Sequence, residues 1–325
     1  MPDETNVAAT SDPITPVMLQ TAREIAAKSD CRAILVYADT FRDDEAIRGF
    51  VQSVDDAQVI LVTRSVDRCR VCEGLGALAV QVPRVRLTRM GQIQVAILLA
   101  VSRGLLDRGD RVLCLSGIAE SGALDSLLVT EVGGEFELFA AEGAEEIPSH
   151  VRSEVFERVL DIAVSLGIEG REGRPVGTLF VLGDTEEVLR HSEQMILNPF
   201  RGYPEAERNL LDPLLTETIK EYATLDGAFV VREDGVVECA GRFLRSTIAG
   251  RPLPSGLGAR HQSAAAVTAA TSAVAIAVSE STGNVTIFEK GKILFEIQRP
   301  RPLGPEPPAQ GHRRSRDQAA AEEDA

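Results

Sequence analysis

The chain has 325 residues, and because single domains usually span roughly 100 to 200, we expect two domains and a tail. Its 49 acidic and 34 basic residues give a net charge of -15, which repels a nucleic-acid backbone and argues against a DNA or RNA binder. No apolar run reaches the roughly 18 to 20 residues of a membrane helix, and the N-terminus lacks the features of a signal peptide. We therefore expect a cytoplasmic protein with no membrane partner.

Five cysteines, an odd number without a secretion signal, do not indicate a disulfide framework. Cys69 and Cys72 form the only close pair, and a second pair at zinc-ligand spacing is missing, with His150 as the nearest histidine. The pair is therefore interpreted as two incidental thiols on a helix.

After a polar arm over residues 1–12, the segment 13–140 alternates between helical and strand-like patterns. The pattern predicts helices at Val17–Ala27, Asp43–Val51 and Met90–Leu105, and strands at Cys31–Tyr37, Val59–Thr63, Ala77–Val80 and Arg111–Leu115. Strands that alternate with helices predict an α/β domain with a doubly wound parallel sheet, covered on both faces.

Three stretches of this half, Arg103–Val112, Leu115–Gly117 and Val129–Val132, resemble the C-terminal domain of pyruvate kinase. In that family, loops at the carboxyl ends of the strands bind a sugar-phosphate effector in some members. Here the loop Ala38–Asp44 is too acidic for a phosphate, which favours a structural or oligomerisation role over effector binding.

The acidic stretch Ala140–Ser149 marks a boundary, after which residues 150–299 read as a second domain with a mixed sheet flanked by helices. The predicted helices are Val151–Leu166, Leu211–Tyr222 and Ser263–Ala270, and the predicted strands are Gly177–Asp184, Asp226–Arg232, Val236–Ala240, Ala273–Ser279, Val285–Phe288 and Lys292–Ile297. Asp234-Gly235 predicts a hairpin turn. The tail, residues 300–325, is rich in proline and charge and is expected to be disordered.

Two short motifs in the second domain have residue types suited to a metal and a triphosphate. Asp226 offers a carboxylate, and Gly227 lets a ligand approach the backbone, although such a pair alone is more often a simple turn. Arg260 and His261 open a helix after a glycine-containing loop, where backbone N–H groups and a guanidinium suit phosphate. His261 fits a capping or core role equally well.

Asp226-Gly227-Ala228, Arg260-His261 and Ser279–Gly283 stand in the order and spacing of the diadenylate cyclase family, whose enzymes have a DisA-type domain. The resemblance runs from about Val151 to Ile297. Together with the pyruvate-kinase-like half, the arrangement resembles the archaeal subgroup often called DacZ.

The resemblance implies that two ATP are condensed into the second messenger cyclic di-AMP by a homo-oligomer in which two domains meet face to face. A divalent metal, Mn²⁺ or Mg²⁺, is implied as cofactor. Asp226 would engage the metal and the ribose 3′-hydroxyl, Arg260, His261 and Ser263 the triphosphate, and Phe243 and Leu244 the adenine. The implied site residues are Asp226, Arg260 and His261 for catalysis, Asp226 for metal, and Gly227, Ala228, Phe243, Leu244, Gly258, Ser263, Glu280 and Thr282 for ATP.

The chain departs from the family pattern at two positions. Gln262 stands where the family often has a second arginine, and Leu225 stands where some bacterial members have a metal-binding histidine. These departures keep open an alternative, a catalytically weak ATP-binding sensor. A metabolite-binding regulator that acts through the first domain is the third possibility.

Overall fold

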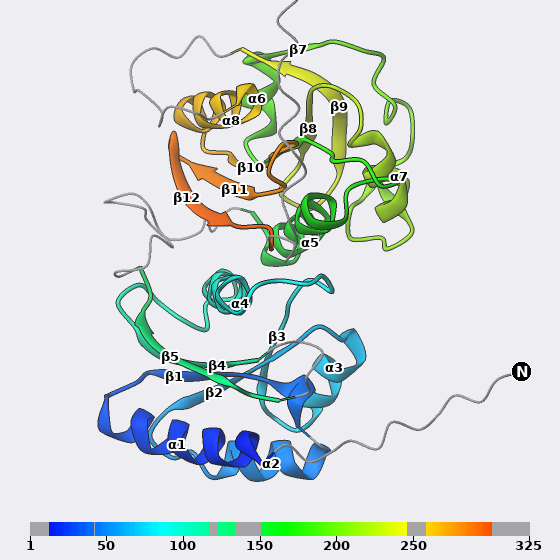
Figure 1. Cartoon of the computed structure of the whole chain (residues 1–325). Helices are drawn as coiled ribbons and strands as arrows, with labels where there is room; N and C mark the ends of the chain where they lie inside the picture. Colours follow the sequence, from blue (N-terminus) through cyan, green and yellow to red (C-terminus); the bar gives the residue numbers. More distant parts are fainter. Residues whose placement is uncertain (1–12, 42, 118–122, 134–150, 246–257, 301–325) are drawn as a thin grey trace, which may run out of the picture.

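The structure is a computed structural model that describes residues 13–41, 43–117, 123–133, 151–245 and 258–300. Two sheets follow one another along the chain, one of five strands and one of seven (Figure 1). Within those ranges, none of the helices combines the length and apolar character needed to cross a bilayer. Three predicted segments lie outside the described residues: the N-terminal arm, the acidic boundary over residues 140–149 and the tail after Pro300.

The first sheet has the strand order β3-β2-β1-β4-β5. Its strands are β1 (Ala33–Tyr37), β2 (Gln58–Thr63), β3 (Leu78–Gln81), β4 (Arg111–Ser116) and β5 (Ser126–Glu131). Its helices are α1 (Ile14–Lys28), α2 (Asp44–Gln52), α3 (Val66–Gly74) and α4 (Arg89–Ser102), with a 3-10 turn at Ala38–Thr40. Strands β1 to β4 are parallel, and Figure 1 shows α1 and α2 on one face and α4 on the other. The doubly wound parallel arrangement is confirmed for these four strands.

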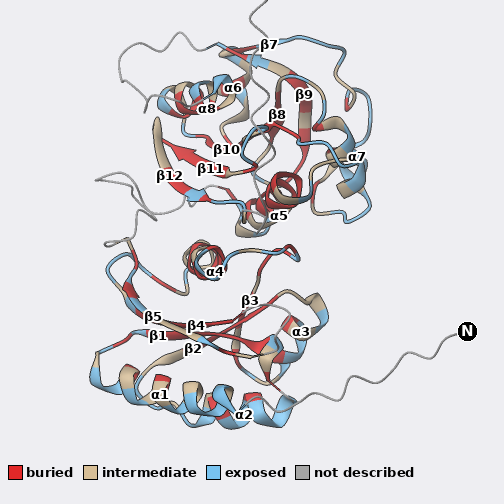
Figure 2. Cartoon of the chain, viewed as in Figure 1, coloured by how far each residue is buried: buried red, intermediate tan, exposed pale blue. Residues whose placement is uncertain are grey.

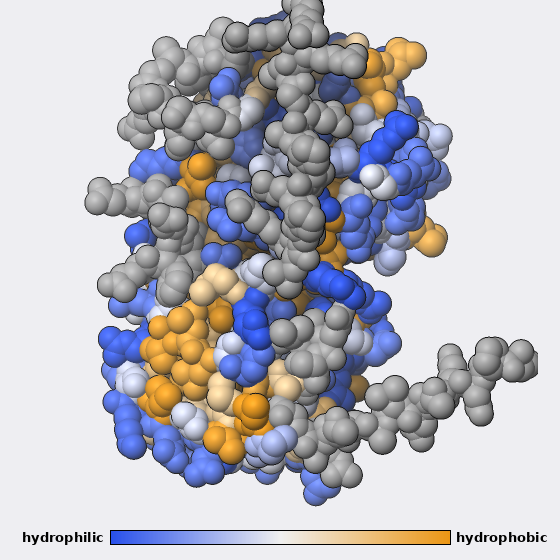
Figure 3. Space-filling model, viewed as in Figure 1, coloured by the Kyte–Doolittle hydropathy of each residue, from blue (hydrophilic) through white to orange (hydrophobic). Residues whose placement is uncertain are grey.

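Strand β5 was missed by the sequence patterns, and it runs antiparallel to β4. The connection over residues 117–125 is too short for the crossover that a parallel neighbour requires, so the chain turns back along β4. Val129 of this edge strand and Val17 of α1 remain exposed, and Figure 3 shows apolar surface gathered on this part of the first unit.

Helix α3 carries both thiols of the close cysteine pair. Cys69 and Cys72 are buried, and burial raises the pKa of both thiols, that of Cys69 to about 11. A protonated thiol is a poor metal ligand and a poor nucleophile. The two residues therefore act as core side chains of α3, and the sequence interpretation had placed them on a helix as incidental thiols.

The second sheet has the order β12-β11-β10-β6-β8-β9-β7. Its strands are β6 (Thr178–Leu182), β7 (Ser192–Gln194), β8 (Ala228–Val231), β9 (Val237–Leu244), β10 (Val274–Val278), β11 (Val285–Glu289) and β12 (Lys292–Ile297). Its helices are α5 (Ser153–Glu169), α6 (Thr185–Arg190), α7 (Leu215–Tyr222) and α8 (Ala259–Ala270), with a 3-10 turn at Glu205–Arg208. Among the described strands of this sheet, only β6 and β8 pair in parallel, and the predicted hairpin at Asp234-Gly235 joins β8 to β9. The mixed sheet is confirmed, while α6, β7 and the 3-10 turn were not predicted.

Alternating side chains of the central strands supply a core on each face of this sheet. On β6, Leu179 and Val181 belong to the core under α6 and α8, whereas Phe180 and Leu182 belong to the core under α5. Figure 2 shows the strands buried between the helices. Because the α5 core is continuous with that of the first unit, the two sheets share apolar packing.

The two units meet where α4 packs against α5 and β12. Arg103, just after α4, donates from Nε to Glu157 Oε1 at 2.6 Å and from Nη2 to Oε2 at 2.8 Å. It also donates from Nη1 to the carbonyl of Ala79 at 2.8 Å. The side chains of this pair are only 27% and 16% exposed, so water screens the pair little.

We expect Glu157→Ala to lower the free energy of unfolding by about 1–3 kcal/mol, because it leaves the Arg103 guanidinium half-buried without its carboxylate. Chemical denaturation measures the loss. The control is Glu186→Ala, which breaks the exposed pair with Arg190 on α6 and should change stability by less than about 1 kcal/mol. Equal effects of the two substitutions would show that the Arg103 pair contributes no more than a surface contact.

Candidate active site

A cleft of about 1040 Å³ opens where the starts of β6 and β8, the ends of β9 and β10, and the first turn of α8 meet. All of the residues that the resemblance implies for the site line this cleft: Asp226, Gly227, Ala228, Phe243, Leu244, Gly258, Arg260, His261, Ser263, Glu280 and Thr282. They come from segments far apart in the sequence, and the mixed sheet brings these segments to one edge. The volume is ample for a nucleotide.

Asp226 lies just before β8, whereas the sequence patterns had placed it as the first residue of the strand. The strand begins at Ala228 because Gly227 has φ of +102°, a left-handed conformation that breaks the ladder. A Cβ atom on Gly227 would also lie 2.7 Å from the backbone nitrogen of Arg242 and 2.8 Å from Gly241 Cα. Residue 227 is thus glycine for two reasons, its left-handed conformation and the lack of space for a Cβ atom. The turn at Gly227 leaves the Asp226 side chain 85% exposed in the cleft.

Arg260 lies between two carboxylates. Its Nη1 is 3.1 Å from Glu280 Oε2, and its Nη2 is 3.5 Å from Asp226 Oδ1. The guanidinium is 32% exposed and Glu280 is 62% exposed, so these ion pairs add little to stability. Their importance is positional, since they bring the basic helix start, the Asp226 turn and the turn after β10 to one point.

Asp226 and Glu280 offer oxygen donors of the type that Mg²⁺ and Mn²⁺ prefer. Among the described residues, no three histidine, cysteine or carboxylate side chains cluster as a ready-made metal cage. A divalent cation held by one or two carboxylates together with substrate phosphates is a usual arrangement in phosphate-transferring sites. The donor set therefore fits a cation that binds with a triphosphate.

His261 lies in the first turn of α8 with its ring turned into the protein. The side chain is 7% exposed, its Nε2 is 3.2 Å from Thr286 Oγ1, and the ring meets Phe288 edge to face at 5.9 Å. Burial lowers the pKa of His261, the Glu296 carboxylate opposes this shift, and the Arg260 charge adds to it. The ring is thus buried and mainly neutral at neutral pH, which fits the capping or core role that the sequence left open beside the phosphate role.

This lowered pKa predicts a pH effect on stability. Below a pH of about 6.5, the pKa of His261 in the unfolded chain, the unfolded chain binds a proton that the folded chain does not bind. The free energy of unfolding therefore decreases as the pH is lowered from about 6.5 to the folded pKa. We expect His261→Gln to flatten the pH dependence of the unfolding free energy in that window, by at most about 1.4 kcal/mol per pH unit. Denaturation midpoints between pH 5 and 8 measure it, with His191→Gln at the half-exposed end of α6 as control. An unchanged slope in His261→Gln would contradict the expectation.

Phe243 and Leu244 end β9 beside the cleft. Phe243 is 49% exposed and offers a ring face for stacking, whereas Leu244 is buried. Met195, which was not predicted, lines the same side and is exposed as well. The apolar side of the cleft thus has one open aromatic ring and a flexible thioether.

The turn after β10 is held by its own hydroxyl groups. Thr282 N donates to Ser279 Oγ at 3.3 Å, and Gly283 N donates to the Ser279 carbonyl at 2.8 Å. Gly258 caps α8, and Ser263 lies one turn into the helix. The hydroxyl groups of Ser263, Ser279 and Thr282 thus belong to the lining of the cleft.

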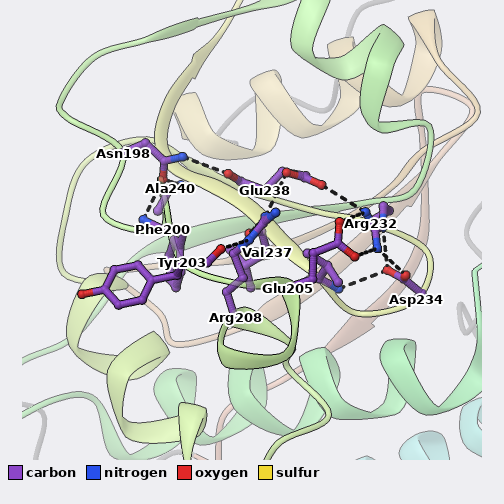
Figure 4. A network of polar contacts seen from close by, with 11 residues as sticks. Asn198, Phe200, Tyr203, Glu205, Arg208, Arg232, Asp234, Val237, Glu238 and Ala240 are labelled. Atoms are coloured by element: carbon purple, nitrogen blue, oxygen red, sulfur yellow. Dashed lines mark hydrogen bonds and ion pairs between the residues drawn. The ribbon is translucent and has the colours of Figure 1, made fainter.

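A polar network fixes the segment between β7 and α7 on β9 (Figure 4). Asn198 Nδ2 donates to the Glu238 carbonyl at 2.9 Å, and Asn198 Oδ1 accepts from Phe200 N at 3.0 Å. Arg208 Nη1 donates to the Val237 carbonyl at 2.7 Å and to Glu238 Oε2 at 2.9 Å. The network holds the chain that begins with Met195, so it supports the apolar side of the cleft.

Arg242, Asn284 and Glu296 are among the lining residues that the sequence analysis did not single out. Arg242 donates from Nε to Ser192 Oγ at 2.9 Å and fastens β7 to β9, and Glu296 Oε1 accepts from Asn284 Nδ2 at 2.7 Å. The strand containing Arg242 was predicted to end at Ala240. Period-two alternation through a longer β9 and through β12 is the signal that could have placed Arg242 and Glu296.

Comparisons with known proteins identify relatives of both parts of the chain. The family model described as DisA bacterial checkpoint controller nucleotide-binding matches residues 165–293, and the model described as probable sensor domain DacZ_P matches residues 16–139. A diadenylate cyclase of Methanocaldococcus jannaschii is 36% identical over 206 residues, which span 63% of this chain and 65% of that protein. A diadenylate cyclase of Haloferax volcanii is 36% identical over 203 residues, which span 61% of this chain and 71% of that protein.

Solved structures give weaker similarities. DacA from Staphylococcus aureus aligns with a TM-score of 0.32 and 20% identity over 43% of this chain and 84% of that one. A hypothetical membrane spanning protein from Bacillus cereus aligns with a TM-score of 0.34 and 23% identity over 45% and 64%.

Proposed function

Because the chain belongs to the diadenylate cyclase family, we propose that it condenses two ATP molecules into cyclic di-AMP and releases two pyrophosphates. The observation that carries the proposal is the position of Arg260 between Asp226 and Glu280, in a nucleotide-sized cleft. A guanidinium there can pair with phosphate oxygens, and a carboxylate beside it can orient a hydroxyl.

In each condensation, the ribose 3′-oxygen of one ATP forms a bond to the α-phosphorus of the other. The bond from that phosphorus to the β-phosphate oxygen breaks, and pyrophosphate leaves. Asp226 would orient the 3′-hydroxyl and take its proton, while Arg260 would balance charge on the triphosphate. A divalent cation, Mn²⁺ or Mg²⁺, would neutralise phosphate charge when bound and would be held by Asp226 with Glu280 beside it.

A ring closed by two such steps needs two nucleotides in opposed orientation. We propose that two copies of the domain over residues 150–299 meet face to face, each with one ATP, within a homo-oligomer. The exposure of Asp226 and Phe243 supports this arrangement, because the reacting carboxylate is open to a nucleotide brought by a second copy. The cleft would be closed to water by that partner.

We propose that residues 13–140, which pack on the second unit through the shared core, have a structural or oligomerisation role. In the loop after β1, the Asp39 carboxylate accepts from Thr63 Oγ1 at 2.5 Å and from Arg64 N at 3.1 Å. A carboxylate thus occupies the strand ends where a phosphate effector would have to sit, which supports a role other than phosphate binding.

The test is chromatography of a reaction of the whole chain with ATP and Mn²⁺ or Mg²⁺. We expect cyclic di-AMP and pyrophosphate in a ratio of one to two, and no product after chelation of the metal. ATP binding without product would support the alternative, a nucleotide sensor weakened by Gln262 and Leu225. Absence of both binding and product would overturn the proposed function.

A further inference from the structure

Gly177 lies against two charged side chains of the site, Arg260 and Glu280. It lies directly before β6 and is buried. A Cβ atom built on Gly177 would lie 2.5 Å from Arg260 Nη1, 2.9 Å from Arg260 Cζ and 2.8 Å from Glu280 Cβ. Separations under 3.0 Å are shorter than real contacts of a Cβ atom, so any side chain at this position would displace Arg260 or Glu280.

Both members of one ion pair therefore converge on the same point of the backbone. Nη1 is the Arg260 atom that pairs with Glu280, at 3.1 Å. Since Arg260 also reaches Asp226 through Nη2, a shift of the guanidinium away from residue 177 would alter both of its carboxylate contacts. The position of the Arg260 guanidinium thus depends on the absence of a side chain at residue 177.

Backbone conformation does not explain why residue 177 is glycine. The described glycines with positive φ include Gly227 but not Gly177. Alanine could adopt the backbone conformation of residue 177 without left-handed strain. The remaining reason is space for Arg260 and Glu280.

We propose that Gly177 is a positioning residue, which lets the Arg260 guanidinium and Glu280 lie against the main chain at the geometry that receives the triphosphate. The inference rests on the proposed function only in that ATP is the ligand. It goes beyond that function by giving a role to a residue outside the motifs of the family resemblance. Gly177 touches no reacting atom and acts only through Arg260 and Glu280.

The experiment is a double-mutant cycle read by ATP affinity in the whole chain, measured by calorimetry with Mn²⁺. Gly177→Ala is expected to weaken ATP binding by about tenfold or more, because overpacking a tight site moves its side chains. In the Arg260→Ala background both contacts with the guanidinium are gone and only the contact with Glu280 Cβ remains, so the same change should weaken binding by less than about threefold. Gly74→Ala is the matched control, since a Cβ atom there meets nothing within 4 Å, and it should leave affinity unchanged.

Melting temperatures of all variants separate positioning from folding. If Gly177→Ala lowers the melting temperature while ATP affinity is unchanged, the glycine serves only the fold and the inference is wrong. The inference would also be wrong if the loss of ATP affinity in the double variant equalled the product of the two single losses, because the two positions would then act independently. If the single variant does not fold, the double variant should fold better, and failure of both would contradict the inference.

The cycle also separates this inference from the proposed function. If the wild-type chain binds ATP but makes no cyclic di-AMP, the proposed turnover is wrong, and the double-mutant cycle can still be measured by ATP affinity. Wild-type chain that binds no ATP overturns both. Turnover with an uncoupled cycle overturns the positioning role alone.

Discussion

Asp226→Asn should abolish formation of cyclic di-AMP while leaving ATP affinity within about threefold of wild type. The amide keeps the shape of the side chain but cannot accept the 3′-hydroxyl proton or supply an anionic metal ligand. Because Asp226 is 85% exposed, the substitution should leave the melting temperature unchanged. Product chromatography and calorimetry measure the two effects. Asp67→Asn, an exposed carboxylate on α3, is the control and should keep full activity.

The same variant tests the face-to-face arrangement. When mutant and wild-type subunits exchange, a hybrid pair has one competent Asp226, so it should form the first phosphodiester bond and rarely the second. The linear intermediate pppApA should then accumulate as the mutant fraction rises. With subunit exchange proven by labelled chains, a simple dilution of cyclic product and no linear species would rule out the two-copy mechanism.

The elements with strong periodicity could be placed from the sequence because their apolar patterns match their burial. The predicted strand Val59–Thr63 and β2 differ by one residue, and Lys292–Ile297 is β12 as observed. The caps of helices also act locally, as with Asp43, whose Oδ1 accepts from Ala46 N at 2.8 Å at the start of α2. Strand β7 was missed because three residues give no period, and its pairing with the end of β9 depends on the fold.

The site could be anticipated only in part, since its motifs are separated by long stretches of chain. The order of the Asp226, Arg260 and Glu280 motifs indicated a family, but the ion pairs of Arg260 span separations of 34 and 20 residues. No local pattern encodes such contacts. Gly177 could not be anticipated from the sequence, because its proposed role follows only from the three-dimensional structure, in which Arg260 and Glu280 occupy the space that a Cβ atom would need.

His261 shows why residue type alone leaves roles open. Beside Arg260 at the start of a helix, the sequence permits either a phosphate ligand or a core histidine. The helix turns successive side chains by about 100°, so Arg260 faces the two carboxylates while His261 faces Thr286 and Phe288. The packing of α8 on β10 and β11 sets which of its side chains face the cleft, and this depends on the fold rather than on residue type.

We expect Arg260→Ala to weaken ATP binding by about 10- to 100-fold, the loss of a charge-assisted contact worth about 1.5–3 kcal/mol. The melting temperature should change little, because its partners Asp226 and Glu280 are both exposed and the ion pairs contribute little to folding.

Arg260→Lys distinguishes charge from geometry. Lysine keeps the charge but lacks the planar fork that reaches two partners at once, so it should recover only part of the affinity. Calorimetry at fixed salt and metal concentration measures all three proteins. If Arg260→Ala bound ATP as tightly as wild type, the guanidinium would serve only to hold Asp226 and Glu280, and the triphosphate would have to be bound by the hydroxyl-rich turn after β10. If lysine restored affinity fully, a point charge would be enough, and the fork between the two carboxylates would have no part in nucleotide binding.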